Sequence, residues 1–387
     1  MQKSPLIFQR VLPHYRVPLF RRLQKELGYL LCYSREKTGA SLSSVPPDAL
    51  DFPVKRLPRF YFLSGETFVA QNPWVVLRRE RPSLVVCECA IGYVTLWLLL
   101  LLRPFFTFSL VLWGHGVRNE HVLRPFPGWR GAVLRWLYRR ADGVLVYSKE
   151  RLTLLRPYLP PDLPAWVAPN SIDLEPFHRL RRSLEKIGKT KVREELGFQP
   201  GATFHLIWIG RLLPSKRPDL LLEAWEKVRI RFPAELHIVG DGPALEGLKA
   251  RRPEGVKFYG AVYDEDLTGR LLYASDLFVM PGYIGLSILH AFSMGVPLLS
   301  CRTRDGVGPY HSPEISYLQD GTNGLLVDDN ADAIADAIVA LLANPERLSG
   351  MSIAAQKMAE SAGLDPMVEA FREMAQWAEN PPGKRAP

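Results

Sequence analysis

The sequence predicts an α/β protein with two doubly wound parallel-sheet domains that face a central cleft. Short apolar runs of strand length alternate with longer amphipathic stretches, which is the pattern of Rossmann-like βα units rather than of a β-sandwich. The alternation stops after Asn170, in a stretch rich in Arg, Lys and Glu, and begins again at Phe204. A chain of 387 residues is long enough for two such domains.

Strands are expected in the first half where the apolar runs carry Val, Leu and Phe on both faces, which suits a sheet covered by helices on both sides. They span residues 6–8, 29–34, 84–88, 106–114, 143–148 and 165–169. Residues 90–102 and 105–117 are very apolar, but neither stretch reaches the ~18 to 20 residues that a membrane span needs. We interpret them as a buried helix and a core strand, with a membrane hairpin as the alternative.

In the second half, strands are expected at 204–209, 236–239, 277–280 and 297–300. Helices are expected at 218–232, from about Leu286, and at 331–342, 349–362 and 366–379. The predicted domains are therefore 1–190 and 191–362, with residues 174–203 forming a linker and a connecting helix. A C-terminal helix at 363–379 is expected to pack back on the first domain, and 380–387 to form a disordered tail.

Charge is distributed unevenly along the chain. Residues 1–190 contain 29 basic and 14 acidic residues, net +15, whereas the remainder is net −6. A basic first domain indicates contact with anions such as phospholipid head groups, phosphate-bearing acceptors or nucleic acid. Four cysteines with one close pair, Cys87 and Cys89, fit neither a zinc site nor a disulfide framework. With no signal peptide apparent, we expect a cytoplasmic protein.

The first candidate site follows the strand at 204–209. Gly210 and Arg211 begin a loop in which Lys216 is the second cation, and a helix follows. Two cations five residues apart at the carboxyl end of a strand can converge on a diphosphate, Arg as a fork and Lys as a point charge. A solvated basic loop is the alternative interpretation.

A second candidate lies at 281–290, where a strand ends and a helix begins. Gly282 and Gly285 allow a ligand to approach the backbone, and the free N–H groups near Leu286 and Ser287 favour an anion. The loop after the strand at 236–239, with Gly242, is plausible as part of a nucleotide pocket. Taken alone, each of these signals is weak.

In the first half, His115 lies between two glycines directly after a core strand, where a ligand is reached more readily than the core. A structural histidine is the alternative. Residues 12–18 follow the first strand without the Gly-x-Gly-x-x-Gly fingerprint, so binding of NAD or FAD loses its main support. His14, Tyr15, Arg16 and Arg118 are candidates for contact with an acceptor.

Two literal motif matches are discounted. The Gly-Lys-Thr at 188–190 lacks the first glycine of a phosphate-binding loop and no strand precedes it, which favours linker. The acidic run at 264–266 has the spacing of a metal-binding Asp-x-Asp, but acidic residues favour a helix start by themselves. No residue is assigned as a metal ligand.

Taken together, these segments resemble the GT-B fold nucleotide-sugar glycosyltransferases, specifically the retaining glycosyltransferase family 4, also called glycosyl transferases group 1. The resemblance is strongest over residues 204–330 and rests on the order and spacing of several short motifs. They are 209–211 with Lys216, 239–243, 273–276, Gly285-Leu286 with Ala291, 295–297, Glu314, 320–321 and 323–324, with 113–116, Asp142 and 168–173 in the first half.

The resemblance implies roles for the matching positions. Arg211 and Lys216 would neutralise the donor diphosphate, with backbone N–H groups at 285–287, and Glu314 would lie at the donor site. His115 would lie near the transferred sugar. Transfer would proceed with retention by front-face attack, with neither a metal nor a dedicated general base, so the protein supplies positioning and stabilisation of leaving-group charge. No cofactor is expected beside the UDP-, GDP- or dTDP-linked donor.

One departure concerns two glutamates that the family usually carries eight residues apart. Gly282 and His290 stand at these positions. The first glutamate contributes to the sugar site and the second accepts hydrogen bonds from the ribose, so its loss reduces the penalty for a deoxyribose donor such as a dTDP-sugar. We favour an active enzyme, and a non-catalytic nucleotide- or glycan-binding relative is the alternative.

The expected function is transfer of a sugar to a glycan or lipid-linked acceptor, in the synthesis of cell-surface polysaccharide such as lipopolysaccharide, or of glycolipid. Residues 130–140 combine arginines with Trp136 and other apolar side chains, a composition suited to an anionic bilayer. We expect peripheral contact at the inner face of the cell membrane, with a helix half in the core as the alternative. Nucleic acid is not an expected partner, because no recognition motif organises the basic residues.

Overall fold

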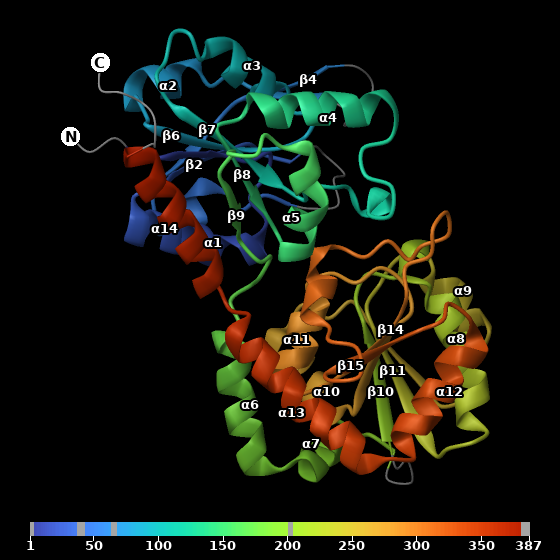
Figure 1. The fold of residues 1–387 in the computed structure, drawn as a ribbon. Coiled ribbons are helices and arrows are strands. Elements are labelled where there is room, and N and C mark those ends of the chain that lie inside the picture. Colours follow the sequence, from blue (N-terminus) through green and yellow to red (C-terminus); the bar gives the residue numbers. More distant parts are fainter. Residues whose placement is uncertain (1–3, 37–42, 63–67, 200–203, 381–387) are drawn as a thin grey trace. The chain divides into compact units, whose positions relative to one another are not determined.

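The chain folds into two compact units in the computed structural model, which describes residues 4–36, 43–62, 68–199 and 204–380 (Figure 1). Unit 1 combines the chain up to Asp173 with the chain from Leu364 onward, and unit 2 is Leu174–Gly363. The division therefore lies earlier than residue 190, where the sequence predicted it. Of the predicted tail at 380–387, residues 381–387 lie outside the described part.

Unit 1 is built on a parallel sheet of seven strands in the order β3-β2-β1-β6-β7-β8-β9. In the register of this sheet, Leu6 lies between Leu30 and Val85. A separate antiparallel hairpin is formed by β4 (Arg59–Phe62) and β5 (Phe68–Gln71). The strands of the main sheet are β1 (Leu6–Phe8), β2 (Leu30–Tyr33), β3 (Val54–Arg56), β6 (Leu84–Glu88), β7 (Ser109–Gly114), β8 (Gly143–Val146) and β9 (Ala165–Val167).

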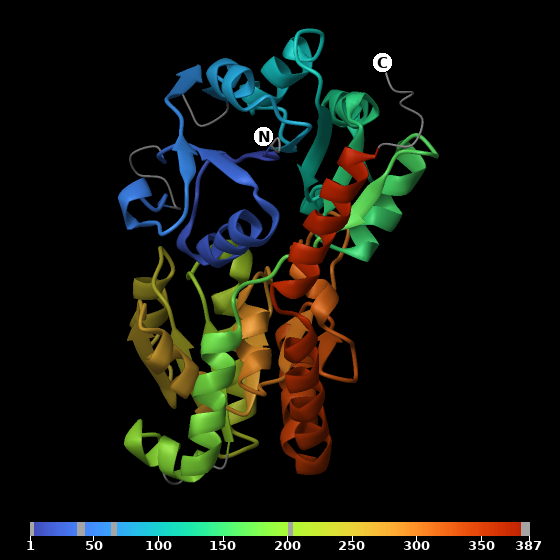
Figure 2. The ribbon, with the colours of Figure 1, turned by 90° about the vertical axis from the view of Figure 1, so that its left-hand side faces the viewer.

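Both faces of this sheet are covered by helices. Alternate residues of a strand point to opposite faces, and here they belong to two separate buried clusters, as Leu6 and Ile7 do. From the far end of the chain, α14 packs on α1 and β9 (Figure 2), and Phe371 meets Trp113 edge to face. The helices are α1 (Val17–Leu27), α2 (Trp74–Glu80), α3 (Val94–Leu102), α4 (Gly128–Arg140), α5 (Lys149–Leu155) and α14 (Asp365–Glu379).

The apolar stretch between residues 90 and 117 forms α3 and β7, which confirms the helix-and-strand interpretation. In β7 every residue is buried. Over the described residues, none of the helices has both the length and the apolar character needed to cross a membrane.

Unit 2 is built on a parallel sheet of six strands in the order β12-β11-β10-β13-β14-β15. Two parallel sheets within α/β units confirm the predicted fold class. The strands are β10 (Phe204–Ile209), β11 (Ala234–Val239), β12 (Val256–Gly260), β13 (Leu277–Met280), β14 (Leu298–Cys301) and β15 (Gly324–Val327). The direction of winding reverses between β10 and β13, and ligands of such sheets bind beyond the carboxyl ends of the strands at that point.

The helices of unit 2 include two in the stretch where the sequence predicted a linker and a connecting helix. The first, α6, packs on α10 and α11, and in the second, α7, the Lys189 Nζ donates to Asp276 Oδ1 at 2.8 Å. Asp264 caps α10 through the backbone N–H groups of residues 266 and 267, as expected for a helix start. The helices are α6 (Glu175–Ile187), α7 (Lys189–Glu195), α8 (Pro218–Arg229), α9 (Leu245–Ala250), α10 (Glu265–Ala274), α11 (Ser287–Ser293), α12 (Ala331–Leu342) and α13 (Pro345–Ser361).

Candidate functional site

The loops after β10 and β11 are held together by glycines. Gly240 has a φ of +144°, and a Cβ at this position would lie 1.8 Å from the carbonyl oxygen of Gly210. A Cβ at Gly242, with φ +154°, would lie 2.6 Å from the carbonyl oxygen of Leu212. The Leu212 N–H also donates to the Asp241 carbonyl at 2.8 Å. Only glycine permits this close approach, which fixes the start of the loop that carries both predicted cations.

Lys216 ends a short 3-10 helix, Pro214–Lys216, and its side chain is half-buried. Its Nζ donates to the Tyr283 carbonyl at 3.1 Å and lies 5.5 Å from the centre of the Tyr283 ring. Burial lowers the pKa of Lys216 to about 8, while the Glu314 carboxylate acts in the opposite direction. The ammonium group is thus partly removed from water, so an arriving anion would gain more from it than from a fully solvated lysine.

The two arginines of this loop differ in their surroundings. Arg211 is exposed, and within the described part of the chain its guanidinium forms no hydrogen bond or ion pair. Arg217 pairs with Asp329 and donates to the Val307 carbonyl at 3.0 Å, which ties the loop to the segments after β14 and β15. Arg217 therefore shapes the loop, whereas Arg211 has its charge available to a ligand.

Gly282 touches the backbone of the Lys216 loop directly. A Cβ at position 282 would lie 2.3 Å from the Lys216 carbonyl carbon and 2.4 Å from its Cα. The Tyr283 N–H donates to the Ser215 carbonyl at 2.9 Å, which holds the two segments in this contact. A glutamate at 282 would have no room in this arrangement of the backbone.

The turn that leads into α11 is anchored by His311. The Ile284 N–H donates to His311 Nδ1 at 3.2 Å, and His311 Nε2 lies 2.8 Å from the Cys301 carbonyl. These partners set the tautomer, with the proton on Nε2. The Ser312 hydroxyl reaches both the Ile284 carbonyl, at 2.6 Å, and the buried Glu314 carboxylate. His311 and Ser312 therefore position the residues of the predicted donor site.

Two positions of this turn are suited to a ligand. At Gly285 a Cβ would meet no atom closer than 3.7 Å, and φ is not in the left-handed region, so neither packing nor backbone conformation within the chain requires glycine. The Ser287 Oγ is buried and finds no hydrogen-bond partner among the described residues. Buried hydroxyl groups are normally hydrogen-bonded, so this one is available to a water molecule or a ligand. Leu286, the N-cap of α11, lies between them.

His290 is occupied in packing. Its ring stacks on Phe177 of α6, with 4.7 Å between the ring centres and 29° between their planes. Burial lowers the pKa of His290 to about 4, so the ring is neutral at pH 7. As a predicted donor contact it offers a neutral nitrogen where the family has a carboxylate.

In unit 1, His115 is exposed directly beyond the carboxyl end of β7. Its ring meets Tyr147 edge to face at 5.2 Å. Gly116 has a φ of +70°, and a Cβ there would lie 3.3 Å from Val146, so the turn that presents His115 needs this glycine. At this exposed position, the His115 side chain can be reached by a ligand.

The predicted acceptor residues of unit 1 differ in exposure. Arg16 is buried, bonds to Asn170 Oδ1 and lies over the Trp113 ring at 5.5 Å, so it holds the strand ends together rather than presenting a free charge. His14 and Tyr15 are exposed. Arg118 is exposed and pairs with Glu120 at 2.6 Å.

Sequence reasoning missed one further group of side chains. Three buried side chains of β10 and β11 bring atoms that can bind a metal ion close together. They are His205, Glu235 and His237. A Glu-x-His pair on one strand and a histidine near the start of another is the signal that could have found them.

Comparison with known proteins finds a family that matches most of unit 2. Residues 203–344 match the family Glycosyl transferases group 1. A GDP-mannose-dependent alpha-(1-6)-phosphatidylinositol monomannoside mannosyltransferase of Mycolicibacterium smegmatis is 31% identical over 188 residues, 44% of this chain and 46% of the relative. A D-inositol 3-phosphate glycosyltransferase of Geodermatophilus obscurus is 31% identical over 232 residues, 54% of this chain and 47% of the relative. The matches thus span about half the length of these curated relatives.

Solved structures show the fold over nearly the whole chain. Anabaena HepE in complex with UDP superposes with a TM-score of 0.70 at 18% identity, covering 97% of this chain and 100% of the other. WaaG, a glycosyltransferase involved in lipopolysaccharide biosynthesis, superposes with a TM-score of 0.63 at 15% identity, covering 96% and 99%. At these identities the likeness establishes the fold.

Proposed function

We propose that this chain, whose second unit belongs to the glycosyl transferases group 1 and whose fold is GT-B, transfers a hexose from a nucleoside diphosphate donor to a lipid-linked or other glycan acceptor. The observation that carries the proposal is the pairing of an exposed Arg211 with a half-buried Lys216 beside the open turn at Gly285. All three follow the ends of β10 and β13, where the winding of the sheet reverses.

The proposed chemistry is stabilisation of the leaving diphosphate. Arg211 and Lys216 face negative charge that grows on the β-phosphate as the bond to the sugar breaks, and the backbone N–H groups at 285–287 add to it. We propose retention, with the leaving phosphate taking the acceptor proton, and no catalytic metal. His115 is the proposed contact of the transferred sugar. Omission of Mg²⁺ and Mn²⁺ should leave the transfer rate unchanged.

For the donor, the proposal includes tolerance of deoxyribose. The ring of His290 packs on Phe177 and is neutral, so no carboxylate at that position grips the ribose hydroxyl groups. A hydrogen bond from the ribose to a carboxylate would be worth about 1.5–3 kcal/mol, and dTDP could not form it fully. Because no carboxylate stands at position 290, UDP and GDP lack this advantage, and we expect dTDP to bind within about tenfold of them. Binding of UDP or GDP at least tenfold tighter than dTDP would contradict this part of the proposal.

For the acceptor, two relatives provide the chemistry. Their names state that they act with phosphatidylinositol monomannoside and inositol 3-phosphate, both of which carry phosphate. The net charge of +15 over residues 1–190 supports an anionic acceptor for this chain as well. We therefore propose an acceptor with a phosphate group, presented on a lipid.

The surface of unit 1 supports contact with a membrane. On α4, Trp129 is 66% exposed and lies under the Arg130 guanidinium at 5.3 Å, and Trp136 is 44% exposed with Arg140 at 5.2 Å. Beyond the end of α3, Phe105 is 72% exposed. Aromatic rings and arginines together favour the interface of an anionic bilayer, while Leu134, Leu137 and Tyr138 turn the other side of α4 to the core. We propose a peripheral position at the cytoplasmic membrane face.

The second candidate function is a non-catalytic nucleotide- or glycan-binding protein. It is favoured by one observation, the presence of Gly282 and His290 where the family carries two glutamates. Such a protein would bind a nucleoside diphosphate and transfer nothing.

The test is a transfer reaction with the full chain, UDP-, GDP- or dTDP-hexose, and vesicles that contain a phosphatidylinositol mannoside. The expected product is the lipid with one added hexose by mass spectrometry, formed by the wild type and lost in Lys216→Met. Free hexose from donor hydrolysis in the absence of an accepted lipid would also support a transferase. Nucleotide binding with neither transfer nor hydrolysis would contradict it and support the second candidate.

A further inference from the structure

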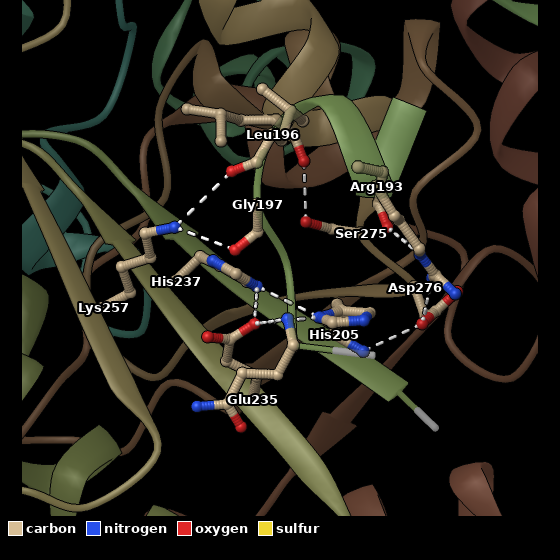
Figure 3. Close-up of polar contacts among 12 residues, drawn as sticks. Arg193, Leu196, Gly197, His205, Glu235, His237, Lys257, Ser275 and Asp276 are labelled. Carbon is tan, nitrogen blue, oxygen red and sulfur yellow. Dashed lines mark hydrogen bonds and ion pairs between the residues drawn. The ribbon is translucent and has the colours of Figure 1, made fainter. Parts of the chain in front are cut away.

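Three buried side chains of unit 2 point their ligand atoms at one another (Figure 3). His205 Nδ1 lies 3.2 Å from His237 Nε2 and 3.4 Å from Glu235 Oε2, and His237 Nε2 lies 3.3 Å from the same Glu235 oxygen. The three atoms form a nearly equilateral triangle. None of these residues takes part in the proposed donor site.

The register of the sheet produces this triangle. His205 on β10 is paired directly with Glu235 on β11, in parallel strands. Residues i and i+2 of a strand lie on the same face, so His237 projects beside Glu235. His205 and Glu235 are the second residues of β10 and β11 and His237 lies in the middle of β11, whereas Lys216 and Gly285 follow strand ends, so the triangle is separate from the proposed donor site.

The triangle has the dimensions of a tetrahedral zinc site. With metal–ligand bonds of about 2.0–2.1 Å, neighbouring ligands of tetrahedral Zn²⁺ lie about 3.3 Å apart. The three observed separations lie within 0.1 Å of that value. We propose that His205, Glu235 and His237 bind one Zn²⁺ through Nδ1, Oε2 and Nε2, with the fourth position left for a water molecule.

The surroundings supply what a zinc site needs around its ligands. The Tyr259 hydroxyl lies 3.0 Å from His237 Nδ1 and can accept its proton, which leaves Nε2 free to bind the metal. The Gln199 N–H donates to Glu235 Oε2 at 3.2 Å and orients the carboxylate. Phe198 stacks on the His237 ring with 3.8 Å between ring centres, which excludes water from that face.

The charged groups near the triangle have polar partners of their own. Arg193 pairs with Asp276 Oδ2 at 2.6 Å, and this same oxygen accepts the His205 backbone N–H at 2.9 Å. Lys257 donates to the carbonyl oxygens of Leu196 and Gly197 at 3.5 and 3.3 Å. The Glu235 carboxylate therefore remains the negative charge that faces the metal.

A metal-free arrangement is the competing explanation. In it, one of the two facing nitrogens carries a proton and donates to the other histidine or to Glu235, while the second nitrogen turns a lone pair toward the Glu235 oxygen. A metal ion binds the lone pairs of all three atoms at once and so removes this repulsion. The role of the ion would be to join β10, β11 and residues 198–199, and so to stabilise unit 2.

The test uses the full chain, stripped of metal with a chelator and titrated with ZnCl₂ or CoCl₂. We expect one equivalent of zinc by elemental analysis, a higher melting temperature with zinc, and the visible absorption of tetrahedral Co²⁺. His237→Gln and Glu235→Gln should lose all three responses, and Tyr259→Phe should weaken zinc affinity by about 10- to 100-fold.

The matched control is His178→Gln, a histidine of α6 in the same unit but outside the triangle, which should keep one equivalent of zinc. Absence of stoichiometric zinc and of a tetrahedral Co²⁺ spectrum in the wild type would overturn the proposal, whether or not the variants fold. Retention of one equivalent by His237→Gln would overturn it as well.

Discussion

The Cα of Gly282 is packed against the backbone of Lys216 so closely that a Cβ would lie 2.3 Å from the Lys216 carbonyl carbon. This contact joins the two loops that follow β10 and β13, and it brings Lys216 Nζ within 3.1 Å of the Tyr283 carbonyl. The glycine is therefore part of how the lysine is positioned. In this backbone arrangement, a side chain at position 282 would disturb the lysine.

Gly282→Glu should damage the site instead of restoring it. The side chain must displace the Lys216 backbone, and overpacking of this kind costs about 1–3 kcal/mol. We expect a lower melting temperature and weaker binding of a nucleoside diphosphate, measured by thermal unfolding and calorimetry. Gly350→Glu, on the exposed side of α13 where a Cβ meets nothing within 4 Å, is the control and should change neither quantity. Tighter donor binding by Gly282→Glu would contradict the packing argument.

Donor affinity should fall as the pH rises through about 8, the pKa to which burial lowers Lys216. An anion binds the protonated lysine and raises its pKa, so by linkage affinity is full below the pKa of the free protein and declines above it. A sugar nucleotide should be used, because its diphosphate does not titrate in this range.

Lys216→Arg should flatten this pH profile, because arginine stays charged at all the pH values used. The control is Lys227→Arg, because Lys227 lies on α8 and forms an exposed ion pair with Asp332 of α12. This variant should keep the pH profile of the wild type. A profile that is equally steep in Lys216→Arg would assign the titration to another group.

His115→Ala should lower kcat for transfer and leave nucleotide affinity unchanged, since the proposed contact is with the sugar in unit 1 and not with the diphosphate. A loss of about 10²-fold is expected when one group that stabilises charge at the reacting centre is removed. His121→Ala, in the neighbouring 3-10 helix, serves as the control. Full activity of His115→Ala would remove this residue from the mechanism.

Trp129→Ser combined with Arg130→Ser should reduce flotation with vesicles of anionic lipid at low salt. The Trp129 ring and the Arg130 cation lie together on α4. The ring contributes apolar burial in the interface and the arginine contributes attraction to anionic lipid, and salt screens only the second contribution. Ile230→Ser, at a residue of unit 2 that is 74% exposed, is the control for loss of an apolar side chain. A wild-type chain that stays entirely in the soluble fraction would rule out the membrane proposal.

Much of the fold was predictable because buried parallel strands are continuous apolar runs. β1, β6, β10 and β13 agree with the sequence prediction residue for residue. β12 was missed because its residues are only partly buried and Lys257 interrupts its apolar run. β15 was missed because its apolar run, residues 325–327, is only three residues long. Residues 174–195 form two helices that pack on α10, where the sequence predicted a linker and one connecting helix, because Arg, Lys and Glu dominate this stretch and hide its packing positions.

The candidate site was predictable where it consists of residues next to strand ends. Arg211, Lys216 and Gly285 follow β10 and β13, which are neighbours in the sheet. The role of His311 could not be predicted, because it depends on a hydrogen bond to the Ile284 backbone from a different loop. Arg16 was predicted as an acceptor contact from its place after β1, but burial against Trp113 is a matter of packing that sequence position does not reveal.

The most direct test of the central claim is calorimetric titration of the wild type and of Arg211→Met/Lys216→Met with UDP, GDP and dTDP. The account predicts that at least one nucleotide binds the wild type and that the double variant loses at least about tenfold in affinity, since each charged contact is worth about 1.5–3 kcal/mol. Equal affinity in both proteins would contradict the assignment of the diphosphate site to Arg211 and Lys216.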